Sequence, residues 1–315
     1  MALERPLKLG TRSSPLAMWQ AEAVKQGLLE AHDWPQDAVE IIPMSTRGDR
    51  VQDRPLAEIG GKGLFTEEIE AGLLDGRLDL AVHSMKDVAT QLPDGLIIST
   101  YLPREDPRDA LIAAPGIGSL DDVPAGAIVG TASLRRGAQT LAKRPDLRLE
   151  PMRGSVQTRL DKIEKGVAVA TYLAYAGLKR LGLEDRAVKP LETTEMLPAL
   201  CQGIIGIEIN AGNEALAALL APLNHMPSHY AALCERAMLA RLDGSCRTPI
   251  AGLSQVSADG ATIHLKGAVF ADDGSASIFH EDSAPVAEAA ALGTRVGDVI
   301  AGQAADIPAI TVGDK

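Results

Sequence analysis

The first part of the chain alternates between short apolar runs and longer segments with helical spacing. Residues 7–11 have the pattern of a short strand, and Ser14 followed by Pro15 is typical of the N-cap and first position of a helix. Apolar positions about 3.6 residues apart continue that helix. A second helix is expected over 66–76, followed by a strand over 78–82. This alternation predicts a parallel or mixed sheet with helices on its faces.

The same pattern recurs in the middle of the chain. Residues 127–131 form another apolar run ending in Gly-Thr, and Ser133 precedes an amphipathic helix. The short similarity to residues 10–13 suggests a duplicated unit. The polar stretch 103–109 between the two units contains two prolines and is typical of a crossing segment or hinge. After about Pro222 a helix, short strands and an alanine-rich helix predict a small α+β third domain.

Composition narrows the class of protein. The chain has 315 residues, enough for two or three domains. The net charge of −11 argues against a general nucleic-acid-binding protein, which needs a basic surface. The longest apolar stretches are too short to cross a membrane, and the polar start lacks the pattern of a signal peptide. A cytoplasmic location is therefore expected.

Cysteine usage fits that location. Cys201, Cys234 and Cys246 are odd in number and lack CxxC spacing, so neither a disulfide framework nor a metal site is expected. Cys246 lies in a Gly-Ser-Cys-Arg loop, where Arg247 would favour a thiolate, and this makes it a candidate nucleophile. On the residue alone, a buried small apolar side chain is the alternative. The sequence has no P-loop, no dinucleotide-binding glycine motif and no HExxH motif.

Six arginines stand at or just after turns that contain glycine, serine or threonine. A helix N-terminus with a guanidinium group beside it binds carboxylate or phosphate, and clustered cations recur in anion sites. Each arginine taken singly is better explained as a solvated surface charge. Together they predict an anionic ligand, without distinguishing carboxylate from phosphate. The six are Arg12, Arg135, Arg136, Arg153, Arg159 and Arg180.

The segment 81–87 follows a predicted strand, where the functional groups of open α/β sheets gather. Lys86 beside Asp87 would keep the carboxylate ionised, which suits it to accept N–H bonds or to stabilise a cation. The alternative is an exposed turn with a neighbouring ion pair. His83 lacks an evident triad partner and is expected to be structural rather than catalytic.

Several longer motifs resemble a single family, in that family's order and over nearly the whole chain. Residues 235–251, ERAMLARLDGSCRTPIA, resemble the cofactor-attachment signature of the porphobilinogen deaminase (hydroxymethylbilane synthase) family. The other matching segments are 11–17, 60–65, 83–87, 104–109, 133–136 and 177–182.

The resemblance implies a transferase of haem biosynthesis. Members join four porphobilinogen molecules head to tail, release ammonia at each addition and free hydroxymethylbilane with water. Their primer is a dipyrromethane cofactor, and the resemblance implies a thioether that ties it to Cys246. Asp87 matches the catalytic aspartate, which would bond pyrrole N–H groups and stabilise the cation formed as ammonia leaves, and Lys86 stands beside it.

Further positions follow from the same resemblance. Every pyrrole unit carries two carboxylates, so a growing chain needs many cations. The cofactor-binding positions match Lys86, Asp87, Thr131, Ser133, Arg135, Arg136 and Cys246. The substrate-binding positions match Arg12, Ser14, Lys62, Phe65, Arg153, Arg159 and Arg180.

The expected fold class is α/β. It has two similar periplasmic-binding-protein-like α/β domains with mixed sheets, and a small α+β C-terminal domain that carries the cofactor cysteine. Domain 1 is expected over 1–103 and 202–222, domain 2 over 104–201 and domain 3 over 223–315. The resemblance further implies a monomer that takes porphobilinogen and passes its product to uroporphyrinogen-III synthase. Neither nucleic acid nor a membrane is expected as a partner.

Three positions depart from the family pattern, and one rival function stays open. Ser155 stands where Asn is frequent, Val169 where Asp is frequent and Cys201 where Gly is usual, which puts local loop geometry in doubt but not the reaction.

The rival is a two-lobed protein that binds an anionic ligand without catalysis. Such a protein needs no reactive cysteine.

Overall fold

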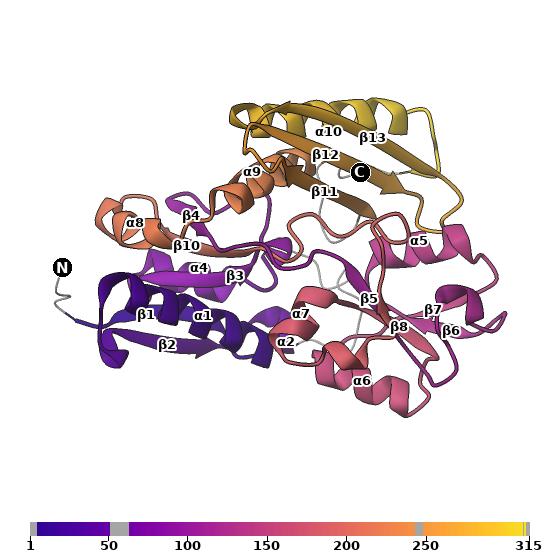
Figure 1. Ribbon diagram of the computed structural model, residues 1–315, viewed down its shortest axis with the longest axis horizontal. Coiled ribbons are helices and arrows are strands. Elements are labelled where there is room, and N and C mark those ends of the chain that lie inside the picture. Colours follow the sequence, from indigo (N-terminus) through magenta and orange to yellow (C-terminus); the bar gives the residue numbers. More distant parts are fainter. Residues whose placement is uncertain (1–4, 51–62, 243–247, 311, 313–315) are drawn as a thin grey trace. The chain divides into compact units, whose positions relative to one another are not determined.

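The computed structural model describes residues 5–50, 63–242, 248–310 and 312 (Figure 1). These residues divide into two compact units. The first unit contains the described residues up to 50 together with 63–105 and 203–229, and the second contains 106–202 and the described residues from 230 onward. Within the described part, no helix is both long and apolar enough to cross a membrane.

The first unit is built on a mixed five-stranded sheet in the order β2-β1-β3-β10-β4. The strands β1, β2 and β3 run parallel, whereas β10 runs antiparallel to β3 and β4. Because β10 comes from a later part of the chain, residues 203–229 complete a sheet that the first hundred residues begin. The strands are β1 (Leu7–Arg12), β2 (Val39–Met44), β3 (Leu80–Ser84), β4 (Leu96–Tyr101) and β10 (Ile205–Asn210).

Helices cover both faces of this sheet, which explains its apolar strands. On one face α1 (Pro15–His32) packs Val24 and Leu28 against Leu9 and Ile207. On the other face α4 (Glu67–Leu74) packs against β1, β3, β4 and β10. The remaining helices that begin in this unit are η1 (Gln36–Ala38), α2 (Arg47–Arg50), η2 (Met85–Asp87), α8 (Glu214–Leu220), η5 (Ala221–Leu223) and α9 (Met226–Arg241).

The second unit contains a sheet of the same design, in the order β7-β6-β8-β5-β9. Again three neighbouring strands are parallel, and the fourth strand, β5, is antiparallel to both of its neighbours. Its strands are β5 (Asp109–Ala113), β6 (Ile128–Gly130), β7 (Arg148–Glu150), β8 (Ala170–Ala174) and β9 (Lys189–Pro190). Its helices are η3 (Leu120–Asp122), α5 (Leu134–Lys143), α6 (Val156–Glu164), α7 (Tyr175–Arg180) and η4 (Glu184–Arg186).

The C-terminal part of the second unit has an antiparallel sheet in the order β11-β12-β13. Its strands are β11 (Ile250–Val256), β12 (Thr262–Phe270) and β13 (Ser277–Pro285), followed by η6 (Val286–Glu288) and α10 (Ala289–Ala304). The helix α10 packs Val296 and Ile300 against this sheet together with Met238 of α9. A second apolar cluster joins Ala251 and Phe270 of the sheet to α5.

The predicted fold class is confirmed. The two mixed α/β sheets and a smaller C-terminal part with a sheet and helices are all present. The repeated strand–turn–helix motif is present too, because β1 leads into α1 as β6 leads into α5. The predicted boundaries of three separate domains stay a prediction.

Candidate functional site

The carboxyl edge of the first unit's sheet brings together several predicted residues. Because β1 and β3 are parallel neighbours, the segments that follow them lie at one edge of the sheet. Arg12 is the last residue of β1, and Ser14 follows it as the N-cap of α1. Lys86 and Asp87 lie in η2, directly after β3. A carboxylate, two cations and a helix N-terminus therefore share this edge.

The turn that carries Asp87 is anchored from inside the sheet. The Met85 side chain is 1% exposed, and its backbone N–H donates to the carbonyl of Ile204 at 3.0 Å. One residue earlier, the hydroxyl of Ser84 is hydrogen-bonded to the side-chain amide of Gln20 at 2.8 Å. These contacts fix the end of β3, and Asp87 itself stays partly exposed.

Arg12 makes a defined contact at this edge. Its guanidinium carbon lies 4.2 Å from the centroid of the Phe65 ring, within the range of a cation–π interaction. Gly48 makes room for that ring, because a side chain at position 48 would collide with Phe65. The structure therefore places two predicted substrate-binding residues, Arg12 and Phe65, in contact. Lys62, another predicted substrate-binding residue, lies outside the described residues.

The second unit gathers its predicted residues at the equivalent edge. The strands β6, β7 and β8 are parallel, so the segments that follow them lie at one edge of the sheet. The residues on these segments are Thr131, Ser133, Arg135 and Arg136 after β6, Arg153 and Arg159 after β7, and Arg180 after β8.

Serine caps prepare two helix N-termini at this edge. The hydroxyl of Ser133 accepts from the backbone N–H of Arg136 at 3.4 Å, and that of Ser155 accepts from Thr158 at 3.2 Å. Ser155, where the family frequently has Asn, thus retains an N-cap, since both residue types serve in that position. Capped helix ends present further N–H groups and a positive dipole, which favour bound anions.

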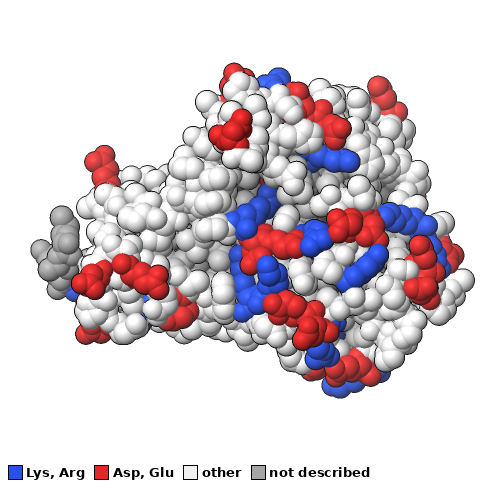
Figure 2. All heavy atoms as spheres, viewed as in Figure 1, with Lys and Arg blue, Asp and Glu red and all other residues white. Residues whose placement is uncertain are grey.

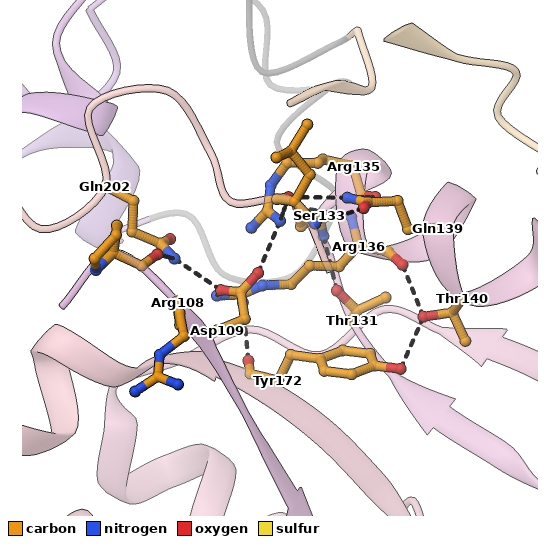
Figure 3. Close-up of polar contacts among 12 residues, drawn as sticks. Arg108, Asp109, Thr131, Ser133, Arg135, Arg136, Gln139, Thr140, Tyr172 and Gln202 are labelled. Carbon is orange, nitrogen blue, oxygen red and sulfur yellow. Dashed lines mark hydrogen bonds and ion pairs between the residues drawn. The ribbon is translucent and has the colours of Figure 1, made fainter. Parts of the chain in front are cut away.

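Two of the predicted arginines point inward instead of lying free at the edge (Figure 3). Arg135 is 5% exposed and Arg136 6%, and both pair with Asp109, which is fully buried. Each guanidinium group donates to a different Asp109 oxygen at 2.7 Å, and the amide of Gln202 donates at 2.9 Å. Backbone carbonyls of the second unit accept from the same two arginines. The arginines are thus held rigidly by a network that the sequence pattern did not indicate.

The charges in this network do not cancel. Burial alone would raise the pKa of Asp109, but the charges of Arg135 and Arg136 outweigh it and hold this pKa well below its usual range. One carboxylate therefore faces two guanidinium groups, which leaves one positive charge. The Nε atom of Arg136 is buried and has no hydrogen-bond partner in the described part of the chain. This buried donor and the surplus charge both suit an added carboxylate.

Asp109 and Gln202 were absent from the residues predicted from sequence. Asp109 stands directly before the apolar run Ala110–Ile112, and a carboxylate at the start of a buried strand signals a buried partner. The identity of that partner was not readable, because Arg135 is 26 residues away in sequence.

The cysteines differ in their surroundings. Cys201 has φ 60°, a left-handed conformation that glycine adopts most easily, so the departure from Gly falls at a strained position. Its backbone N–H donates to the buried carboxylate of Glu235. Cys234 is fully buried, and burial raises its pKa to about 12. Neither described cysteine suits covalent chemistry, and Cys246 lies outside the described residues.

Charged side chains of both signs are interspersed on the drawn surface of the second unit (Figure 2). The ion pairs of this unit include Arg108 with Glu192 and Lys189 with Glu195. These basic side chains are therefore engaged with neighbouring acids.

Comparison with known proteins gives a consistent result over nearly the full length. The family model described as porphobilinogen deaminase, dipyromethane cofactor binding domain, matches residues 7–218. The model of the porphobilinogen deaminase C-terminal domain matches residues 229–302. The chain is 50% identical over 301 residues to the porphobilinogen deaminase of Paracoccus denitrificans (strain Pd 1222), covering 96% of this chain and 95% of that protein.

Solved structures with a similar fold include two solute-binding proteins. A TRAP periplasmic solute-binding protein from Desulfovibrio salexigens aligns with a TM-score of 0.45 and 12% identity, over 73% of this chain and 75% of that one. The periplasmic sulfonate-binding protein SsuA from Methylobacillus flagellatus aligns with a TM-score of 0.40 and 12% identity, over 74% of this chain and 67% of that one.

Proposed function

Because the chain belongs to the porphobilinogen deaminase family, we propose that it builds a linear tetrapyrrole from porphobilinogen in haem biosynthesis. Four porphobilinogen molecules are joined head to tail, ammonia is released at each addition, and water frees hydroxymethylbilane. The observation that carries this proposal is the contrast between two sheet edges. The first presents the carboxylate of Asp87 beside Arg12, Lys86 and the capped N-terminus of α1, and the second presents two capped helix N-termini and several arginines.

We propose Asp87 as the catalytic carboxylate, with Lys86 beside it. Loss of ammonia leaves positive charge on the pyrrole ring and its exocyclic carbon. A carboxylate fixed at the end of a strand accepts a pyrrole N–H bond and stabilises that charge as it develops. The anchored Met85–Ile204 contact supports this assignment, because it holds the turn before substrate binds.

The arginines are proposed to bind the acetate and propionate groups of the substrate. Arg153 and Arg159 follow β7 in the second unit, Arg180 ends the helix that follows β8, and Arg12 and Ser14 lie at the edge of the first unit's sheet. A guanidinium group binds a carboxylate through two parallel N–H donors. The Arg12–Phe65 contact supports a role for Phe65, since the ring holds the guanidinium in place. Lys62 is proposed as an additional cation for the same groups.

The residues present fit a dipyrromethane cofactor. The surplus positive charge beside Asp109 and the unpartnered Nε of Arg136 match the carboxylates of such a group. We propose that Lys86, Asp87, Thr131, Ser133, Arg135 and Arg136 hold it, and that Cys246 carries it through a thioether. When bound, the dipyrromethane supplies the pyrrole carbon to which the first substrate unit is joined. A tethered primer makes each addition effectively intramolecular.

We further propose a cytoplasmic monomer without a metal, nucleic-acid or membrane partner, whose product passes to uroporphyrinogen-III synthase. The lability of a linear hydroxymethyl product favours a consuming enzyme close at hand. The rival function, binding of an anionic ligand without catalysis, accounts for the arginines. It gives Asp87 no role, and it does not account for the full-length match to an enzyme family.

Intact-protein mass spectrometry tests this function. We expect the native protein to carry an added mass equal to one dipyrromethane, and the Cys246→Ser variant to carry none. Cys201→Ser is the matched control and should keep the adduct, because Cys201 is buried in the second unit. An active native enzyme without the adduct, or an adduct that survives Cys246→Ser, would contradict the covalent primer. A native protein that binds porphobilinogen but forms no product would favour the rival.

A further inference from the structure

A group of buried ionisable side chains lies between α4 and the sheet of the first unit. Glu70 of α4 is 7% exposed, His83 of β3 is 5% exposed, and Glu208 of β10 is fully buried. The two strand residues share a face with Ala81, which packs among the apolar residues of α4. Three groups that can carry charge thus occupy a place that apolar side chains would otherwise fill.

The contacts within this group are directional but incomplete. His83 Nε2 lies 2.9 Å from one carboxylate oxygen of Glu208. The other oxygen of Glu208 and one oxygen of Glu70 are buried without a hydrogen-bond partner in the described residues. Burial raises the pKa of Glu70, the negative charge of Glu208 raises it further, and Thr66 and His83 oppose this. Such an arrangement is costly, because each buried polar atom has lost its water.

A buried polar pair is weak evidence of a stabilising role. Replacing a buried ion pair by well-packed apolar residues of similar volume is often neutral or stabilising. Apolar residues of α4, β3 and β4 pack beside the group on the same face of the sheet. Buried polar groups that cost free energy are typical of sites where function depends on the exact geometry.

The pair lies directly behind the turn that carries Asp87. His83 is opposite Gly206 in the β3–β10 register, and Glu208 is the next residue of β10 on the same face. Met85 packs over Gly206, where any side chain would collide with it. The end of β3 is therefore held against β10 by its backbone ladder, by Met85 and by the His83–Glu208 hydrogen bond. Apolar contacts are non-directional, whereas this hydrogen bond is directional and fixes the position of the His83 side chain relative to Glu208.

We propose that the His83–Glu208 pair positions the Lys86–Asp87 turn for the reaction instead of stabilising the fold. Both are positioning residues that act through the end of β3, and Glu70 closes the space from the α4 side. The inference rests on the proposed role of Asp87, because a group that must meet developing charge has to be held within a fraction of an ångström.

The test compares the double variant His83→Leu/Glu208→Met with the single variant His83→Gln. The double variant fills the space with apolar groups, whereas Gln keeps an N–H that reaches Glu208. We expect kcat of the double variant to fall at least about tenfold while KM stays within about twofold. We expect its melting temperature to stay within about 3 °C of the native value or to rise. His83→Gln should restore kcat to within about threefold of native.

The intact mass of each variant shows whether the primer is still attached. A loss of kcat caused by a missing primer is thus not mistaken for a misplaced Lys86–Asp87 turn. Ser254→Ala is the control, since it removes a buried hydrogen bond from the Ser254 hydroxyl to Glu235 of α9. Ser254 belongs to β11 in the separate three-stranded sheet. Ser254→Ala should lower the melting temperature and leave kcat unchanged. If the double variant fails to fold, His83→Phe with native Glu208 removes the hydrogen bond and keeps a planar ring, and its kcat should fall at least about tenfold while KM stays within about twofold.

Two results would overturn the proposal. One is a double variant that carries its primer and keeps native kcat, which would show that the pair does not position the turn for the reaction. The other is a loss of kcat that parallels a fall in melting temperature and is not restored by His83→Gln, which would show a structural role. Failure of the proposed function would look different, because the native protein itself would then form no product.

Discussion

The two five-stranded sheets share strand order and strand direction but not the chemistry of their carboxyl edges. In both, three parallel strands are followed in the sheet by an antiparallel strand, which comes late in the chain in the first unit (β10) and precedes the three parallel strands in the second (β5). In the first unit the described part of this edge carries Asp87 together with the cations Arg12 and Lys86. In the second it carries arginines, two of them locked to Asp109. One repeated scaffold therefore supports two tasks, which we assign to charge stabilisation and to carboxylate binding.

The buried acids on the antiparallel strands show the same divergence. Asp109 of β5 accepts three hydrogen bonds, and its charge is more than balanced. Glu208 of β10 has one partner, His83, and one oxygen without any partner in the described part. The first arrangement stabilises its unit and fixes two cations. The second adds little stability, and its value lies in the geometry of the neighbouring turn.

The largest effect is expected at Asp109. Asp109→Ala leaves two guanidinium groups buried without their carboxylate, which should lower the free energy of unfolding by about 3–5 kcal/mol. Denaturant unfolding measures this loss. Asp106→Ala is the control, since Asp106 pairs with Arg108 at a more exposed site and should cost at most about 1 kcal/mol. Equal losses in the two variants would contradict a special role for the buried network.

Acid dependence of stability sharpens the same comparison. The pKa of Asp109 is lowered in the folded protein, so its contribution is present above the pKa of the unfolded chain and is lost as the pH falls toward the folded value. The stability difference between the native protein and Asp109→Ala should therefore shrink as the pH falls from about 5 to about 2. Unfolding curves at several pH values measure it. A constant difference would mean that the carboxylate charge is not what the arginines stabilise.

Asp87→Ala is expected to separate activity from stability. Removing the carboxylate that we propose to stabilise the developing charge should lower kcat at least about a hundredfold, or about 2.7 kcal/mol, while the melting temperature changes little. Steady-state rates and thermal unfolding measure the two quantities. Asp94→Ala, an exposed site in the loop before β4, is the control and should keep native kcat. Near-native turnover of Asp87→Ala would move catalysis to another group.

A smaller effect is expected at Gly154, which precedes the cap of α6. Its φ of 119° is a conformation that glycine alone adopts readily, and a Cβ there would lie 2.7 Å from Thr158. Gly154→Ala should cost about 1–3 kcal/mol and raise KM, because the Gly154 carbonyl accepts from Arg159 at 3.1 Å. Substrate titration and denaturant unfolding check both effects. Gly166→Ala has a positive φ without a steric neighbour and should leave KM unchanged.

The smallest effect is expected at the helix caps that both units share. Ser14→Ala and Ser133→Ala each remove one side-chain acceptor at a helix N-terminus and should cost about 1 kcal/mol. Denaturant unfolding of the two variants measures this cost. Clearly unequal costs would show that the two turns differ in more than their sequences.

Local signals made much of the scaffold predictable from sequence. The β1–α1 unit was found because Ser14 and Pro15 mark a helix start, and α5 was found because Ser133 follows an apolar run. The strand expected over 78–82 is observed as Leu80–Ser84, since Leu78 instead packs beneath Gly10 and Gly72. Such shifts arise where packing, and not the local pattern, sets the boundary.

The polar networks were not predictable in the same way. The positions of Arg135 and Arg136 after a turn were predicted correctly. The direction of their side chains depends on Asp109, which the antiparallel pairing of β5 with β8 brings close to them. His83 was expected to be structural. Its partner Glu208 lies 125 residues away on a strand that completes the sheet late in the chain. Pairings of this kind follow from topology, which no local motif contains.

The assignment of the two edges is tested most directly by mass spectrometry during a brief exposure to limiting porphobilinogen. The native protein should show its primer mass and then a series of heavier species, each one deaminated pyrrole unit apart. Asp87→Asn, which keeps the shape of the side chain, should retain the primer and show almost none of the heavier species over the same interval. Heavier species that form in Asp87→Asn at the native rate would contradict the account.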